Sequence, residues 1–297
     1  MRLPTSTRSE TRRRGRLLPG LAVAGSLLLA LVLHLLVGGE PAKDVKHGAV
    51  GRGLPRVAPI ARSEERAQLE TAEHHAIERV LAYTQYISRG SPRRREVALT
   101  FDDGPGPATR QILHELRRYH APATFFQVGR MIRSFPLLAR DVVADGNAAG
   151  LHTNNHARLA GMPFAFQRSE TDPANEEIPG YAPNFMHLFR PPYGAFGEKT
   201  MQIMRVRHTL IVLWSVNTFD YLRPGVKTIV KRAVSGAFPG AIILMHDAGG
   251  YTRAETVRAL PAVIKGLRRR HLKLVTVPRM ILDAPPPRQQ KRAVGPG

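Results

Sequence analysis

Two adjacent carboxylates directly follow a short apolar run. Residues 97–101 read Val-Ala-Leu-Thr-Phe, and Asp102-Asp103-Gly104-Pro105 comes next. Asp, Gly and Pro are the usual residues of a turn, so this segment alone is as compatible with a plain turn as with a catalytic site. Carboxylates at such a position can also bind a metal ion or accept a proton.

Two histidines lie four residues apart further along the chain. Residues 152–156 read His-Thr-Asn-Asn-His. On a helix, positions i and i+4 face the same way, and two imidazoles on one face suit a single metal ion. Two surface histidines are the plainer interpretation, because this spacing recurs by chance. With a carboxylate donor, however, the pair completes a set of three ligands that is typical of a catalytic zinc site with an open position.

Three further segments follow apolar runs and carry residues that could do chemistry. Residues 190–194 read Arg-Pro-Pro-Tyr-Gly, residues 214–221 read Trp-Ser-Val-Asn-Thr-Phe-Asp-Tyr, and residues 244–247 read Leu-Met-His-Asp. Two prolines stiffen the first turn and fix where Arg190 and the Tyr193 amide point. Each segment also has a structural interpretation: a rigid loop, buried aromatic residues beside a loop carboxylate, and a structural histidine.

The composition limits which residues could bind a metal and which partners the chain favours. The chain has 297 residues and no cysteine, so any metal must be held by His, Asp or Glu. The length suits one sizeable domain with appendages, and 43% hydrophobic with 23% charged residues indicates a globular protein. A net charge of +21 favours polyanions such as nucleic acid, anionic lipid headgroups or an acidic cell-wall polymer.

Predicted strands and helices alternate from residue 96 onward. Buried-strand runs lie at residues 97–101, 123–128, 186–189, 209–216, 241–245 and 272–277. Helical patterns lie between most of them, at residues 109–119, 130–144, 225–235 and 253–270. This alternation predicts βα units around a parallel sheet. In such folds the functional residues collect at the carboxyl ends of the strands, which is where the segments above fall.

The N-terminal part of the chain has a different character. Six arginines among residues 1–16 precede an apolar run at residues 17–37. As a helix this run would be about 31 Å long, which matches a bilayer core, and the arginines predict that the N-terminus stays inside. A cleaved signal peptide is the competing interpretation, but the run is long and no Ala-x-Ala site follows it.

Residues 38–94 are predicted to form a linker and a spacer or docking helix. The linker is rich in Gly, Pro, Lys and Arg, and the helix spans about residues 63–88 with sparse apolar positions. His74 and His75 are expected on its solvated face rather than as a ligand pair. The tail at residues 284–297 is rich in Pro, Lys and Arg and is expected to be flexible.

Taken in order, the five segments resemble the polysaccharide deacetylase family, carbohydrate esterase family 4, with its NodB-homology domain. The family pattern is Thr-Phe-Asp-Asp-Gly-Pro, His-Ser/Thr-x-x-His, Arg-x-Pro-Tyr, a fourth motif containing Asp, and Leu-x-His, and all lie between Thr100 and His246. The resemblance assigns residues 95–283 to the deacetylase domain. The chain departs from the pattern at residues 147–151, and at Asn217 and Tyr221, where the family commonly has Asp and Trp.

The resemblance implies an α/β fold, a distorted (β/α) barrel with fewer than eight regular units, about seven. It also implies that Asp103, His152 and His156 bind Zn²⁺ or another divalent transition metal. Asp102 would be the general base, held in place by Arg190.

The other matched residues would complete the site. The resemblance implies that His246 is the general acid, tuned by Asp220. The Tyr193 amide would help to bind the oxyanion, and Leu244 and Trp214 would line the pocket for the acetyl group.

The sequence therefore predicts a zinc-dependent deacetylase acting on N-acetyl groups, or O-acetyl groups, of a cell-envelope polysaccharide, with peptidoglycan favoured. The predicted location is the bacterial cytoplasmic membrane, single-pass with the catalytic domain outside, or secretion if the N-terminal segment is cleaved. The alternative is a catalytically silent carbohydrate-binding protein of the same fold. Asp102 and His246 argue against it, because binding needs neither a base nor an acid. No nucleic-acid partner is expected, since no helix-turn-helix or stacking-aromatic motif accompanies the charge.

Overall fold

Strands and helices alternate through the part of the chain that the computed structural model describes, residues 59–172 and 187–292. The strands are β1 (Tyr86–Ile87), β2 (Glu96–Asp102), β3 (Thr124–Gln127), β4 (Ala148–Leu151), β5 (Leu188–Phe189), β6 (Leu210–Val212), β7 (Val216–Asn217), β8 (Ala241–His246) and β9 (Lys273–Leu274). The helices are α1 (Pro59–Leu81), α2 (Thr109–Arg118), α3 (Gly129–Ser134), α4 (Pro136–Ala144), α5 (Phe164–Glu170), α6 (Glu198–Val206), α7 (Val226–Gly236), α8 (Ala254–Arg269) and α9 (Val277–Asp283), with short 3₁₀ turns η3 (Pro192–Gly194) and η4 (Asp220–Leu222).

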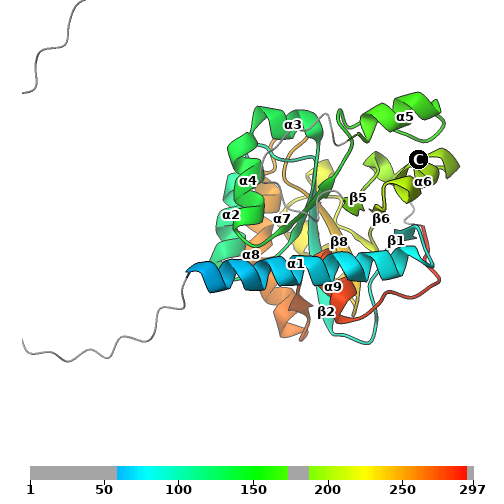
Figure 1. Ribbon diagram of the computed structural model, residues 1–297. Coiled ribbons are helices and arrows are strands. Elements are labelled where there is room, and N and C mark those ends of the chain that lie inside the picture. The colour runs from blue at the N-terminus through cyan, green and yellow to red at the C-terminus, as the bar shows by residue number, and fades with distance from the viewer. Residues whose placement is uncertain (1–58, 173–186, 293–297) are drawn as a thin grey trace, which may run out of the picture. The chain divides into compact units, whose positions relative to one another are not determined.

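One parallel sheet joins these strands. Its order is β1-β6-β5-β4-β3-β2-β8-β7, and β9 pairs with the start of β2. The pairs along this path are all parallel, as expected for βα units. Among the described residues the path runs from β1 at one edge to β7 at the other, and the sheet curls as a half-barrel (Figure 1). The predicted α/β class is confirmed, and the sheet is consistent with a distorted (β/α) barrel.

The two faces of the sheet pack against different helices. On one face, odd-numbered residues of β2 and β8 such as Phe101 join a hydrophobic cluster with α2, α4 and α8. On the other face, Ala98 and Leu244 join a second cluster with α1 and α9, which lie side by side across the sheet in Figure 1. Because side chains alternate along a strand, Asp102 and His246, at the ends of β2 and β8, belong to this second face.

Helix α1, predicted as a spacer or docking helix, packs on the sheet. Its side chains Ile77 and Val80 are buried in the second cluster, and β1, which follows it, pairs with β6. The tail also contacts this region over its described part, because the Tyr83 hydroxyl donates to the Pro286 carbonyl at 2.7 Å. The predicted membrane helix at residues 17–37 lies outside the described residues. Within residues 59–172 and 187–292, no helix has the length and apolar character needed to cross a membrane.

Several sequence predictions differ from the observed elements. The strand predicted at residues 209–216 is two strands, β6 beside β1 and β5, and β7 beside β8. The helix predicted at residues 130–144 is divided into α3 and α4 at Phe135, because the residue before Pro136 is disfavoured in a helix. Strand β4 was not predicted.

The helix predicted over about residues 63–88 ends at Leu81, and residues 86–87 form β1 because they pair with β6. The strand predicted at residues 272–277 is limited to β9, and Val277 begins α9.

Candidate active site

The end of β2 presents two carboxylates in different directions. Asp102 is the last residue of the strand and pairs in register with His246 of β8 and Phe126 of β3. Asp103 has a φ of 77°, a left-handed conformation that is uncommon outside glycine, so the chain turns sharply after the strand. The predicted base and the predicted acid therefore occupy neighbouring positions on adjacent strands.

Asp103, His152 and His156 lie together beside Asp102. The Nε2 atoms of His156 and His152 are 3.1 and 3.5 Å from Asp103 Oδ1. One ligand atom from each of the three residues lies within 4.8 Å of the others. The two histidines are not on a helix, as their spacing suggested, but in the loop after β4, where Thr153 and His156 both have positive φ values.

This trio fits a divalent transition-metal ion. Asp103 Oδ1 is buried without a hydrogen-bond partner in the described part of the chain, although imidazole nitrogens surround it. Burial raises the pKa of Asp103, but the neighbouring His152 and His156 outweigh burial and hold that pKa well below its usual value. His152 Nδ1 donates to the Arg190 carbonyl at 2.7 Å, which leaves the Nε2 lone pair for a metal. Two imidazoles and one carboxylate are the donors that zinc accepts.

Arg190 holds one oxygen of Asp102. The guanidinium is fully buried, and its Nη1 donates to Asp102 Oδ1 at 2.6 Å and to Thr100 Oγ1 at 2.8 Å. Its Nε and Nη2 donate to the carbonyls of Val212 and Leu213 at 2.9 and 3.0 Å. Asp102 Oδ1 is thus fixed, while Oδ2 lies 3.8 Å from His152 Nε2, on the side of the trio.

His246 is paired with a buried carboxylate. Its Nδ1 lies 2.7 Å from Asp220 Oδ1, while its main-chain N–H and the Thr256 hydroxyl donate to Asp220 Oδ2 at 2.9 and 2.7 Å. Burial lowers the pKa of His246, but the Asp220 carboxylate outweighs burial and raises that pKa to about 9. Thr256 was not among the predicted residues, because it lies on α8 outside every motif.

The residues predicted to contact substrate divide into one exposed and two buried side chains. Tyr193 is 51% exposed, has a φ of 62°, and places its hydroxyl 3.4 Å from His156 Nδ1. Trp214 and Leu244 are buried in the second-face cluster. A Cβ at Gly194 would lie 3.1 Å from the Trp214 ring, so the turn carrying Tyr193 sits directly on that ring.

A hollow of about 760 Å³ borders the trio, a size typical of ligand sites. Asp103, His156 and Tyr193 line it together with two residues that sequence reasoning missed, Arg253 and Asp247. Arg253 Nη2 lies 3.9 Å from Asp103 Oδ2. Asp247 is buried, and desolvation raises its pKa to about 7. Its position next to His246 in the sequence was the one available signal.

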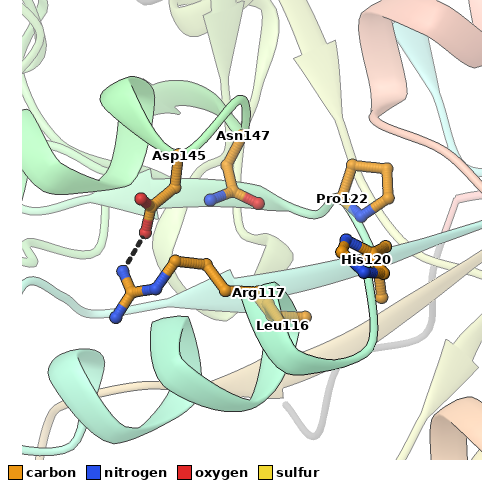
Figure 2. Close-up of a pocket in the computed structure, with 7 residues that line it drawn as sticks. Leu116, Arg117, His120, Pro122, Asp145 and Asn147 are labelled. Carbon is orange, nitrogen blue, oxygen red and sulfur yellow. Dashed lines mark hydrogen bonds and ion pairs between the residues drawn. The ribbon is translucent and has the colours of Figure 1, made fainter. Parts of the chain in front are cut away.

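A second hollow lies away from this site, beside β3 and β4. Figure 2 shows its lining, in which Arg117 and Asp145 form an ion pair. Asn147, one of the departures from the family pattern, points its amide into the fold: it accepts from the Ala123 N–H and donates to the Val142 carbonyl, both at 3.0 Å. Asn147 therefore ties the residue before β3 to the last turn of α4. His152 is oriented instead by the main-chain carbonyl of Arg190.

The curled parallel sheet, with carboxylates and imidazoles gathered at the carboxyl ends of its strands, defines a partial (β/α) barrel with a candidate metal-hydrolase site. A family model described as polysaccharide deacetylase matches residues 89–207. A peptidoglycan-N-acetylglucosamine deacetylase of Bacillus cereus is 34% identical over 199 residues, covering 66% of this chain and 71% of the relative. A chitooligosaccharide deacetylase of Azorhizobium caulinodans is 33% identical over 207 residues, covering 64% of this chain and 97% of the relative.

A solved structure of a deacetylase is also similar to this chain. The crystal structure of a peptidoglycan N-acetylglucosamine deacetylase has a TM-score of 0.62 at 33% identity, covering 66% of this chain and 92% of that one. The chain belongs to the polysaccharide deacetylase family, carbohydrate esterase family 4, with its NodB-homology domain.

Proposed function

We propose that this chain is a metal-dependent deacetylase that hydrolyses N-acetyl groups of a cell-envelope polysaccharide, with peptidoglycan as the favoured substrate and Zn²⁺ as the favoured ion. One observation carries the proposal. Asp102 and His246 lie opposite each other in register on adjacent strands, beside the trio of Asp103, His152 and His156. The names of the relatives support an acetylated glycan of the peptidoglycan or chitooligosaccharide type.

Asp102 is proposed to accept a proton from water. Arg190 occupies Oδ1, so Oδ2, on the side of the trio, is the atom available for this proton. When bound by Asp103, His152 and His156, a divalent ion supplies Lewis-acid chemistry that acidifies water and polarises a carbonyl. The arrangement thus combines the three ligands with a separate carboxylate that remains free to act as a base.

His246 is proposed to protonate the leaving amine. Its Nδ1 faces Asp220, so Nε2 is the atom that delivers the proton as the amide C–N bond breaks and acetate and a free amine form. The main-chain N–H of Tyr193 would stabilise the oxyanion, and Trp214 and Leu244 would form the apolar floor beneath the acetyl methyl group.

The test is acetate release by the full chain from a panel of acetylated glycans: muropeptides, chitooligosaccharides and acetylated xylan. We expect release from at least one glycan, loss of release with a chelator, and recovery on adding Zn²⁺. Heat-denatured protein serves as the control. Tight glycan binding without acetate release, at any metal loading, would instead favour the silent binding protein.

We also propose that residues 17–37 anchor the chain in the cytoplasmic membrane with residues 95–283 outside the cytoplasm. The support is the length of the apolar run and the six arginines before it. An enzyme held there would meet the cell-wall glycan directly.

A further inference from the structure

Three histidines and one glutamate gather at the amino ends of β5 and β6. His74 and Glu78 lie one turn apart on α1, His187 directly precedes β5, and His208 lies just before β6. Because the strands are parallel, their amino ends lie together at the opposite end of the sheet from their carboxyl ends, where the proposed active site lies. The cluster therefore joins the helix that begins the described chain to two strands more than 100 residues later.

The side chains of this cluster lie close together, and one of their buried nitrogen atoms lacks a hydrogen-bond partner in the described part of the chain. The rings of His74 and His187 have centroids 3.9 Å apart, which brings two imidazoles together that would repel each other if both were protonated. His74 Nδ1 is buried without a hydrogen-bond partner in the described part of the chain. Glu78 Oε1 is 4.0 Å from His74 Nε2, and its Oε2 is 3.2 Å from His208 Nδ1.

Two contacts orient His187 and Glu78 as ligands. His187 Nδ1 lies 3.3 Å from the His208 carbonyl, and donation to that oxygen leaves Nε2 as the nitrogen available for a metal. The His208 ring engages one oxygen of Glu78 and leaves the other for an ion.

We propose that His74, Glu78 and His187 bind a second divalent transition-metal ion of the zinc class, distinct from the ion of the active site. One ligand atom from each residue lies within 4.8 Å of the others, a limit that the Asp103 trio also meets, and two imidazoles with one carboxylate form the same donor set. The three side chains are half-buried, so they can be reached by an ion from solvent.

The proposed ion has a structural role. It links α1 to the amino end of β5, next to the point where Ile77 and Val80 of α1 enter the second-face cluster. Since the ion would bind the folded chain and not the unfolded one, it should stabilise the docking of α1 on the sheet.

The experiment measures how many zinc ions bind the full chain, without a histidine tag and after removal of metal. In wild type we expect two equivalents of Zn²⁺ by calorimetric titration and elemental analysis. In the double variant His152→Ala/His156→Ala, which removes the active-site imidazoles, we expect one equivalent to remain. Failure of that variant to bind any zinc would overturn the proposal.

Further changes in that double variant locate the remaining ion. His187→Ala should abolish its binding, whereas His75→Ala, on an exposed neighbour outside the cluster, should leave it in place. If the His187 variant does not fold, Glu78→Gln, which keeps the side-chain size, tests the same ligand set. Retention of the ion in a folded His187→Ala or Glu78→Gln variant would overturn the assignment.

Thermal unfolding provides a second readout. Zn²⁺ should raise the Tm of the double variant by several degrees, and it should not raise the Tm after His187→Ala is added. Neither measurement depends on deacetylase activity, so an inactive enzyme would leave this test intact.

Discussion

Asp102 and Asp103 are adjacent in the sequence but have different neighbours. The positive φ of Asp103 turns its carboxylate toward the two histidines, whereas Asp102 stays in the strand beside Arg190. A ligand and a base can therefore come from consecutive residues without competing for one ion. The motif predicted different roles for the two carboxylates, but the directions in which they point depend on a backbone conformation that sequence does not reveal.

Replacing the proposed base tests its role directly. Asp102→Asn retains an oxygen that can accept from Arg190 but loses the carboxylate that takes a proton. We expect acetate release to fall by about 10²- to 10⁴-fold, the usual contribution of a general base. The measurement is kcat for acetate release, with unchanged zinc content as the control. Full activity in this variant would remove Asp102 from the mechanism.

The Asp220–His246 pair predicts a pH dependence. A general acid must be protonated, and in the metal-free chain the pKa of His246 is about 9 because Asp220 offsets the effect of burial. A bound cation acts in the opposite direction, so the alkaline limb of kcat should fall at or below about pH 9.

Asp220→Asn should move that alkaline limb to lower pH, because only Asp103 and Asp102 would then oppose the lowering of the His246 pKa by burial. The measurement is the pH profile of kcat for wild type and variant. Glycan affinity serves as the control, since a merely structural effect would weaken binding at every pH. An unshifted limb would show that Asp220 does not set the protonation of His246.

Element predictions succeeded where the sequence signal is local. Strands β2, β3 and β8 are apolar runs rich in β-branched or aromatic residues, and they lie close to their predicted positions. Strand β4 reads Ala-Ala-Gly-Leu, which carries little strand preference. It forms because β3 and β5 flank it, and a Cβ at Gly150 would lie only 2.9 Å from atoms of Phe126 and Leu188.

The conformation of the loop after β4 could not be predicted from the spacing of its two histidines alone. Residues four apart face the same way on a helix, but His152 and His156 converge through the left-handed residues Thr153 and His156 instead. The sequence therefore predicted that Asp103, His152 and His156 lie together in space, as they do, but it suggested the wrong local structure for the two histidines.

Helix α1 offers a matched pair of substitutions. Ile77 is fully buried in the second-face cluster, whereas Leu69 on the same helix is 38% exposed. Ile77→Ala should lower the free energy of unfolding by about 2–5 kcal/mol through lost burial and a cavity, and Leu69→Ala should have a much smaller effect. Urea denaturation measures both. Equal, small effects would mean that α1 is a detachable spacer.

At the scale of the whole molecule, the net charge bears on where the protein would accumulate. The net charge of +21 would draw the protein toward anionic polymers or headgroups within about a Debye length of the surface.

Helix α1 was predicted as a spacer because its apolar positions are sparse. The sequence does not show that the curled sheet leaves a face that this helix can cover.

Cell fractionation tests the proposed anchor. The full chain should sediment with membranes and resist extraction by high salt, because an apolar helix is not released by screening charge. A chain beginning at residue 55, which keeps α1 whole, should be soluble. Release of the full chain by salt alone would show that its basic surface, rather than residues 17–37, holds it to the membrane.

The register that sets Asp102 opposite His246 has a consequence for variation within such enzymes. The two groups that we propose to move protons are spaced by the hydrogen-bonded ladder between β2 and β8, not by any loop. Connections around the rim can therefore be lengthened, shortened or exchanged to suit a different sugar chain while the reaction centre keeps its dimensions. Grafting rim segments between relatives is accordingly a rational way to redirect glycan preference.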